Sequence, residues 1–196
     1  VRRCLDKENK CQFIAKEKLK HFVSKDAFNI DGLGKKVIDQ LCSLKLVRKP
    51  SDIFKLDYKK INNLEGWGEL SIKNLKTAIE TARNITLNQF IYSIGIRHIG
   101  QENAKILAGF FSSIKKFTDL FQENKRKELL SNLSNLDGIG ETQIKSIDIF
   151  SSNKKNEEIV KSLVKELKID SYKISDKKGI FSNKNLMFTG GFEKIS

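Results

Sequence analysis

The chain has 196 residues, of which 39% are hydrophobic, so it can bury one sizeable helical core or several small ones. No apolar run approaches the length of a membrane span, and the start of the chain lacks the apolar core of a signal peptide. Lys and Arg outnumber Asp and Glu by 37 to 24, and the net charge of +13 favours a polyanionic partner, although a lysine-rich genome composition would give the same charge.

Apolar residues recur at helical spacing along most of the chain, with turn-forming residues between the repeats. The helical segments are, in chain order, 13–23, 35–45, a short stretch from Pro50, 72–82, 87–94, 104–111, 114–121, 144–150 and 159–167. Residues 169–174 then alternate weakly, as an edge strand does, and residues 185–189 are typical of a second strand. One strand cannot bury a face alone, so we expect the chain to end inside a domain that has been cut away.

Short glycine turns separate several of these helices. The order apolar–acid–Gly–apolar–Gly occurs at 30–34, 64–68 and 136–140, and a looser copy lies at 95–100. Glycine tolerates positive φ, and a helix that begins at the second glycine points unpaired N–H groups outward. The turns therefore predict contacts to nucleic-acid phosphates without base reading. Their spacing of 34, 32 and 40 residues also occurs in solenoids, but the repeated element is a hairpin turn and not a helix-pair consensus.

The turns resemble the helix-hairpin-helix motif, a module that binds DNA phosphates through backbone amides. The order of the surrounding segments is more specific and resembles the bacterial NAD-dependent DNA ligases over essentially the whole chain. The similar segments are 19–34, which resembles the sequence just after the family's zinc finger; 50–56, its connector between the first two hairpins; 90–100 with Ala104, Leu107 and Ala108, its third hairpin; and 181–192, the opening strand of its C-terminal BRCT domain.

The resemblance implies a mainly α-helical fold, in which four tandem helix-hairpin-helix motifs form a compact helical domain with short irregular or β ends. On this interpretation the chain is a fragment of a longer protein. Its expected segments are 1–25, the remnant of a Cys4 zinc finger and a connecting helix; 26–168, the helix-hairpin-helix DNA-binding domain, with hairpins at 30–34, 64–68, 95–100 and 136–140; 169–183, a linker; and 184–196, the first strand of a truncated BRCT domain.

The family implies that the parent protein is an enzyme. Its adenylation domain transfers AMP from NAD to a lysine and then to the 5′-phosphate of a nick, and the 3′-hydroxyl displaces the AMP to seal the strand. That lysine stands in a Lys-x-Asp-Gly motif, which is absent here, because Asn29 and Asn135 occupy its place in the two nearest sequences. We therefore expect no catalytic residue in this chain and no activity from it alone.

The resemblance also implies the partners. These are nicked duplex DNA and the parent's adenylation and OB domains, with NAD and magnesium as cofactors of the full-length parent and no membrane contact. The three cysteines are an odd set without a secretion signal. They predict a reducing cytoplasm, and the resemblance implies that this is a bacterial cytoplasm in which the protein associates with the nucleoid.

We expect the turn amides and nearby cations to hold the DNA phosphates. The predicted DNA-binding residues are Gly32, Gly34, Lys35, Lys36, Gly66, Gly68, Lys73, Gly95, Arg97, His98, Gly100, Gly138, Gly140 and Lys145. Arg97 is the strongest of the cations because its planar guanidinium matches phosphate oxygens and it lies inside a turn. Leu70 stands where the family has a lysine, which weakens the case for a side-chain contact at the second hairpin.

Cys4 and Cys11 resemble half of the family's four-cysteine zinc site, whose other two ligands are missing. Cys42 lies in an apolar helical stripe, so core packing is favoured over metal binding. For His21, packing or capping on its own helix is favoured over a metal-ligand role. His98 sits in a hairpin, where phosphate contact and solvation are both open.

Two other functions are open at this point. A hairpin-bearing DNA glycosylase needs a lysine or aspartate at a base-binding pocket, and Asp148 follows Gly140 by only eight residues, which is closer than that family's spacing. A structural adaptor would use the hairpins to recruit protein, and a DNA-binding assay with and without a nick separates it from a ligase segment. The aromatic residues do not argue for base stacking, since most Phe lie on apolar stripes and Trp67 fits an anchoring role in the core.

Overall fold

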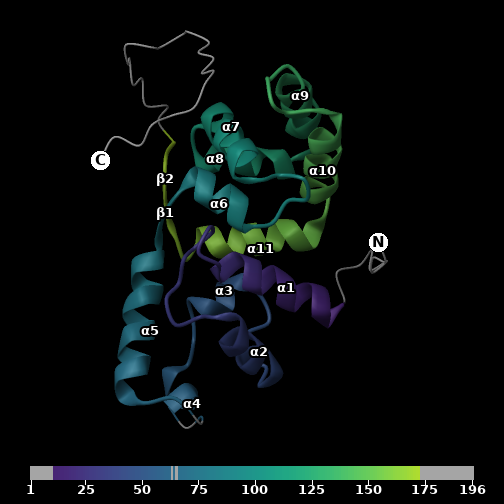
Figure 1. The fold of residues 1–196 in the computed structure, drawn as a ribbon. Coiled ribbons are helices and arrows are strands. Elements are labelled where there is room, and N and C mark those ends of the chain that lie inside the picture. Colours follow the sequence, from purple (N-terminus) through teal and green to yellow (C-terminus); the bar gives the residue numbers. More distant parts are fainter. Residues whose placement is uncertain (1–10, 63, 65, 173–196) are drawn as a thin grey trace, which may run out of the picture.

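The computed structural model describes residues 11–62, 64 and 66–172, which are mainly α-helical, and this confirms the predicted fold class. The helices and strands are, in chain order, α1 (Gln12–Val23), α2 (Lys35–Ser43), α3 (Pro50–Ile53), α4 (Tyr58–Asn62), α5 (Glu69–Ala82), β1 (Asn84–Thr86), α6 (Leu87–Ser93), α7 (Gln101–Phe111), α8 (Ile114–Thr118), the 3₁₀ helix η1 (Asp119–Phe121), α9 (Glu123–Leu133), α10 (Glu141–Ser151), α11 (Lys154–Val164) and β2 (Lys168–Asp170). Figure 1 shows α1 to α5 in one half of the molecule and α6 to α10 in the other, with α11 lying across the middle.

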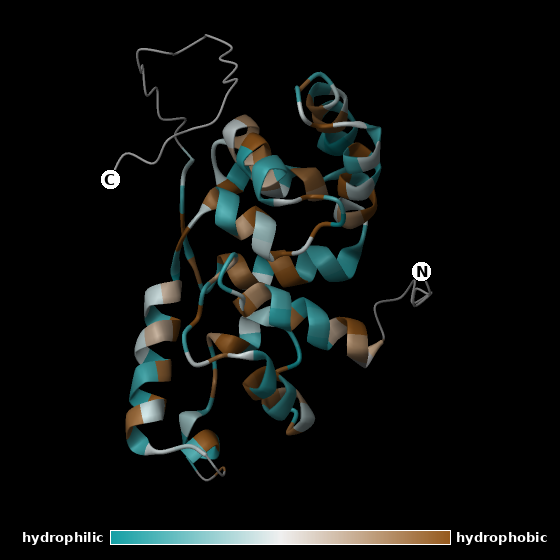
Figure 2. Cartoon of the chain, in the orientation of Figure 1, coloured by the Kyte–Doolittle hydropathy of each residue, from teal (hydrophilic) through white to brown (hydrophobic). Residues whose placement is uncertain are grey.

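The long helices bury the apolar stripes that their sequences predict. In α5, Leu75, Ile79 and Ala82 are buried at spacings of four and three residues, while the polar positions between them are exposed. Figure 2 shows this alternation as brown and teal bands along α5. The buried side chains form one hydrophobic core that includes residues of both halves, with Phe22 and Phe90 among its largest members.

The sequence pattern does not predict α4, α9 or β1. Each of them has a single hydrophobic residue in the buried class: Ile61 in α4, Leu133 in α9 and Ile85 in β1. One buried position establishes no periodicity, so these elements depend on the neighbours against which they pack.

β1 and β2 form a parallel pair, in which Ile85 lies opposite Ile169. The N–H of Tyr172 then donates a hydrogen bond of 3.0 Å to the carbonyl of the residue that follows α7. The predicted edge strand is therefore present as β2. The predicted linker at 169–183 begins with residues that are hydrogen-bonded to the helical body. The rest of that linker and the predicted BRCT strand lie in 173–196, outside the described residues.

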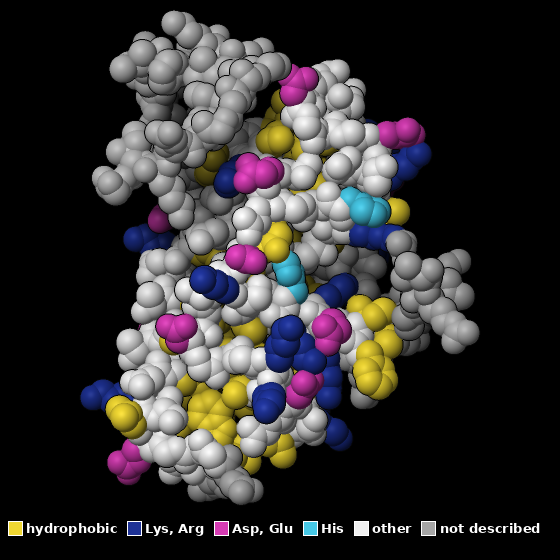
Figure 3. Space-filling model, in the orientation of Figure 1, with side chains coloured by type: hydrophobic (Ala, Val, Ile, Leu, Met, Phe, Trp, Pro, Cys, Tyr) yellow, Lys and Arg dark blue, Asp and Glu magenta, His cyan; other side chains and the backbone are white. Residues whose placement is uncertain are grey.

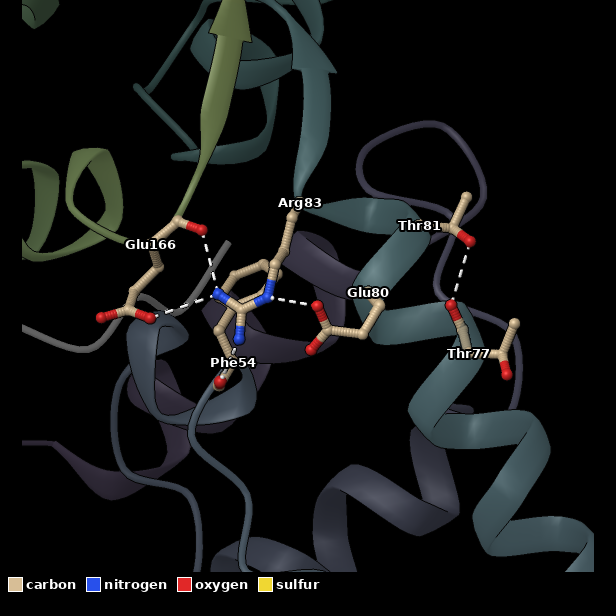
Figure 4. A network of polar contacts seen from close by, with 6 residues as sticks. All are labelled: Phe54, Thr77, Glu80, Thr81, Arg83 and Glu166. Atoms are coloured by element: carbon tan, nitrogen blue, oxygen red, sulfur yellow. Dashed lines mark hydrogen bonds and ion pairs between the residues drawn. The ribbon is translucent and has the colours of Figure 1, made fainter.

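Arg83, which follows α5, joins the two halves of the molecule (Figure 4). Its guanidinium donates to the Glu166 carbonyl at 3.0 Å, to the Glu166 carboxylate at 3.2 Å, to the Phe54 carbonyl at 2.6 Å and to the Glu80 carboxylate at 3.0 Å. Lys55 pairs with the carboxylate of Glu166 at 2.9 Å. The hydrogen bond from Lys55, supported by that from Arg83, holds the pKa of Glu166 below its usual range.

Candidate nucleic-acid interface

Four turns share one backbone conformation. In each turn the N–H of the fourth residue donates to the carbonyl of the first at 3.1–3.2 Å, and the donor–acceptor pairs are Leu33–Ile30, Trp67–Leu64, Ile99–Ile96 and Ile139–Leu136. The third residue has positive φ, which is 86° at Gly32, 85° at Gly66, 60° at His98 and 85° at Gly138. A hydrogen-bonded turn with positive φ at this place has the character of a type II β-turn, in which glycine is the preferred residue. The glycine pattern of the sequence therefore predicted three of the four turns correctly.

The third turn begins one residue later than the sequence pattern indicates. It spans residues 96–100 and has His98 where the other turns have their first glycine. Gly95 instead follows the C-cap of α6 with a φ of 67°, and its N–H donates to the Tyr92 carbonyl at 3.2 Å. A left-handed glycine at this position ends a helix. The expectation that Gly95 forms part of the turn is corrected: Gly95 terminates α6.

The second glycine of each turn is the N-cap of the helix that follows. These N-caps are Gly34 for α2, Gly68 for α5, Gly100 for α7 and Gly140 for α10, and all four are exposed. Within the described part of the chain, the N–H groups of the first three have no protein acceptor, and the first amides of a helix have no intrahelical partner. Gly140 differs, because its N–H donates to Gln143 Oε1 at 3.2 Å. Three turns therefore offer a glycine N–H that the described protein leaves unpaired.

The predicted cations differ in their availability. Those that are exposed and form no ion pair within residues 11–62, 64 and 66–172 are Lys35, Lys36, Lys73 and Arg97. Lys145, by contrast, lies 2.6 Å from Glu141, and this pairing lowers the pKa of the Glu141 carboxyl. Figure 3 shows Lys and Arg side chains gathered over α1 and α2. The first and third turns thus combine unpaired amides with unpaired cations.

The first and second turns lie against each other's helices. A Cβ placed on Gly32 would be 3.6 Å from Leu75 Cδ1 of α5. In the other direction, Trp67 Nε1 of the second turn donates to Gln40 Oε1 of α2 at 3.3 Å. These four residues and Val37 line one groove, and Figure 3 shows hydrophobic side chains in the hollow between α2 and α5. Trp67 is half-buried against the core, as its anchoring role predicts.

The third and fourth turns are paired in the same reciprocal way. Asn103 Nδ2 of α7 donates to the Gly138 carbonyl of the fourth turn at 2.8 Å. A Cβ placed on Gly138 would lie 2.7 Å from Ile106 Cδ1, also on α7. His98 Nδ1 of the third turn lies 3.0 Å from Ser146 Oγ of α10. Each helix that begins at one turn therefore supports the turn of its partner.

Sequence reasoning missed the polar side chains that connect the paired turns. Gln40 and Ser146 both stand six residues after the second glycine of their own hairpin, and both contact the partner turn. A polar residue at this sixth position is the signal that could have found them. Asn103 and Gln143 each stand three residues after the second glycine of their own hairpin. Asn103 contacts the partner turn, whereas Gln143 accepts a hydrogen bond from its own turn.

Among the described residues, no group of three or more His, Cys, Asp or Glu is placed to hold a metal. Cys4 lies outside the described residues, so the predicted half-site that it forms with the half-buried Cys11 stays a prediction. Cys42 packs against the core, and burial raises the pKa of its thiol, which disfavours the metal-binding thiolate. His21 packs, but against α6 and not on its own helix, with Nε2 at 2.9 Å from the Tyr92 carbonyl and its ring edge-on to that of Tyr92.

The two alternative functions gain no support from this geometry. Asp148, which the glycosylase hypothesis would use, has a half-exposed side chain and pairs with Arg126 at 3.3 Å. An adaptor would bind protein through the exposed turns. Three of these turns have a glycine N–H without an acceptor in the described protein, which does not favour a protein partner over phosphate. Within the described chain, none of the helices has the length and apolar character that crossing a bilayer requires.

Comparison with known proteins agrees with the turn geometry. Residues 89–160, which contain the third and fourth turns, match a family model described as the helix-hairpin-helix motif. A protein named DNA ligase from Pelagibacter ubique is 50% identical over 100% of this chain. Proteins of the same name from Rickettsia bellii and Rickettsia rickettsii are 40% and 39% identical over 92% of it. The chain spans about a quarter of these relatives, 28% of the first and 27% of the other two. The chain is therefore similar, over most or all of its length, to one part of proteins named DNA ligase, and its residues 89–160 match the helix-hairpin-helix motif.

Proposed function

We propose that this chain is the DNA-binding segment, from the C-terminal part, of an NAD-dependent DNA ligase, and that it holds a nicked duplex by its sugar–phosphate backbone. The observation that carries the proposal is the set of exposed glycine N-caps at Gly34, Gly68 and Gly100, whose N–H groups have no acceptor in the described protein. Such groups at helix N-termini bind phosphate oxygens and carry no information about base sequence. The homology to proteins named DNA ligase supports DNA as the polyanion.

The four turns contribute unequally in this proposal. The first and third bind most strongly, because Lys36 and Arg97 add unpaired charge beside the amides. The second lacks such a cation at its helix start, where Leu70 is 71% exposed. The fourth contributes least, because Gln143 occupies the Gly140 amide and Glu141 neutralises Lys145.

The parent's chemistry takes place elsewhere in this proposal. NAD supplies the AMP that activates the 5′-phosphate, and magnesium serves the same reaction in the full-length protein. This chain binds and orients the duplex for the adenylation and OB domains and has no ligase activity by itself. Zinc would require ligands in addition to Cys4 and Cys11. The working place of such an enzyme is the bacterial cytoplasm, at the nucleoid.

A salt titration of DNA binding tests the proposal. We expect the affinity for nicked and intact duplexes of unrelated sequence to fall steeply with salt, with a log–log slope of about 0.9 per phosphate contacted. Arg97→Ala and Lys36→Ala should each reduce the slope by roughly one contact. Lys127→Ala, on an exposed position of α9, is the matched control and should leave the slope unchanged. A slope near zero, or equal effects of all three variants, would contradict the proposal.

A further inference from the structure

His98 occupies a backbone conformation that the other three turns give to glycine. Its φ is 60°, against 85–86° at Gly32, Gly66 and Gly138. An L-residue with a side chain is disfavoured there unless its surroundings hold it in place. The imidazole has such a restraint, because Nδ1 lies 3.0 Å from Ser146 Oγ.

The serine determines which imidazole nitrogen carries the proton. Ser146 Oγ donates to the Thr142 carbonyl at 2.9 Å, and a hydroxyl has only one hydrogen to donate. With that hydrogen on the Thr142 carbonyl, Ser146 accepts from His98, and the neutral imidazole is then the Nδ1–H tautomer. Nε2 is then unprotonated and is an acceptor. A phosphate oxygen is also an acceptor, so neutral His98 has no hydrogen bond to offer it.

We propose that Ser146 is a positioning residue that makes His98 a proton-dependent phosphate ligand of the third turn. Protonation from solvent adds a hydrogen to Nε2, while Nδ1–H stays bonded to Ser146. The imidazolium then donates to a DNA phosphate beside the Gly100 amide and Arg97. DNA binding is thereby coupled to the uptake of one proton. This inference rests on the proposed DNA-binding function and adds a pH dependence to it.

The elements around the third turn carry several charged groups and a second histidine, His21 of α1, whose Cδ2 would lie 3.5 Å from a Cβ placed on Gly95. On α7, Glu102 is paired with Lys105 at 2.7 Å. On α10, Glu141 is paired with Lys145 at 2.6 Å and Asp148 with Arg126 at 3.3 Å. Within the third and fourth turns, Arg97 and Asp137 form no ion pair with the described residues, and they have opposite sign. Ordinary carboxyl groups titrate about two pH units below an imidazole, so the range from pH 5.5 to 8 reports mainly on histidine.

The first test measures duplex binding by the 196-residue chain between pH 5.5 and 8 at constant ionic strength. We expect the affinity to rise roughly tenfold from pH 8 to pH 5.5, as one charge-assisted hydrogen bond forms. His98→Gly restores the glycine of the other three turns, so the turn keeps its conformation. Its affinity should change by less than about twofold between pH 8 and pH 5.5. A wild-type affinity independent of pH, or an undiminished pH dependence in His98→Gly, would overturn the inference.

The second test observes the tautomer directly by nitrogen NMR of the imidazoles without DNA. Neutral His98 should show the Nδ1–H tautomer, and Ser146→Ala should abolish this preference and reduce the gain in affinity at low pH. Ser146→Thr, which keeps a hydroxyl, should restore both. His21, bonded to the Tyr92 carbonyl, is the internal reference and should not change. An Nε2–H tautomer at His98 would overturn the inference.

The two proposals fail in different ways. DNA binding that depends on salt but not on pH rejects this inference alone. The absence of salt-dependent DNA binding at any pH rejects the proposed function as well.

Discussion

The guanidinium of Arg83 donates one hydrogen bond to the backbone carbonyl of Glu166 and another to its carboxylate, across a sequence separation of 83 residues. Arg83 follows α5, the helix that begins at the second turn. Glu166 follows α11, which packs against α3 and α10. This contact connects the half that carries the first two turns to the half that carries the other two. This contact therefore helps to hold the two turn pairs in a fixed orientation relative to each other.

Replacing Arg83 should destabilise the protein. Arg83→Ala leaves the Phe54 carbonyl without its donor and the Glu166 carboxylate, only 17% exposed, with Lys55 as its one remaining cation. We expect a loss of about 2–3 kcal/mol in the free energy of unfolding, measured by urea denaturation. Lys60→Ala, which removes an exposed pair with Asp57, is the control and should cost less than about 0.5 kcal/mol. Equal losses in the two variants would show that the Arg83 contacts do not stabilise the junction.

The same carboxylate should make stability depend on pH under acidic conditions. The pKa of Glu166 is lower in the folded protein than in the unfolded chain, so its contribution is fully present above the unfolded value of about 4.3. It is lost as the pH falls from there through the folded value. Urea denaturation at pH 7, 5, 4 and 3 should therefore show a shallower decline below pH 5 for Glu166→Gln than for the wild type. An identical decline would exclude Glu166 as a source of acid sensitivity.

A side chain at the first glycine of a turn should destabilise the fold. Gly138 has a φ of 85°, and a Cβ there would approach Ile106 Cδ1 to 2.7 Å. We expect Gly138→Ala to lose about 1–3 kcal/mol in thermal or urea unfolding, because left-handed backbone is costly for alanine and Ile106 must move. Gly66→Ala is a useful comparison, since φ is 85° and no atom lies within 4 Å of its Cβ position. It should show the backbone cost without the collision, and a larger loss there than at Gly138 would contradict this explanation.

A side chain at the second glycine of a turn should not destabilise the fold. Gly34 has a φ of −67°, and no atom lies within 4 Å of its Cβ position, so Gly34→Ser fits without strain. Serine is a better N-cap than glycine, and its hydroxyl accepts from the amides at the start of α2. Stability should stay equal or rise by a few tenths of a kcal/mol, while DNA affinity falls by about three- to tenfold, because the hydroxyl occupies N–H groups of α2 that lie beside the Gly34 amide. Fluorescence anisotropy beside thermal unfolding measures both, and unchanged affinity would mean that this turn does not contact DNA.

The sequence predicted those features whose causes are local. The apolar stripe of Leu75, Ile79 and Ala82 is enough to predict α5. The glycine pairs are enough to predict the positions of three of the four turns. The predicted position of the third turn was wrong by one residue. A glycine pattern cannot show that His98 adopts positive φ, because the restraint on its ring comes from Ser146, which is distant in the sequence.

The contacts between distant residues were missed, although a polar residue six positions after the second glycine would have indicated Gln40. Gln40, Asn103 and Arg83 are polar residues of a kind that is also common on exposed helix surfaces. Their partners Trp67, Gly138 and Glu166 are distant in the sequence. β1 was missed for the same reason, because three residues with one buried position become a strand only when β2 lies alongside them.

The parallel pairing of β1 with β2 has a mechanical consequence. The segment from Asn84 to Asp170 leaves and rejoins the rest of the molecule at one place, with both strands running in the same direction. Tension applied at residues 11 and 172 would pull the two strands past each other along their length instead of unzipping them from one end. All hydrogen bonds between the two strands would then bear the force together. The helices between them in the sequence, α6 to α11, would not be stretched until these hydrogen bonds broke.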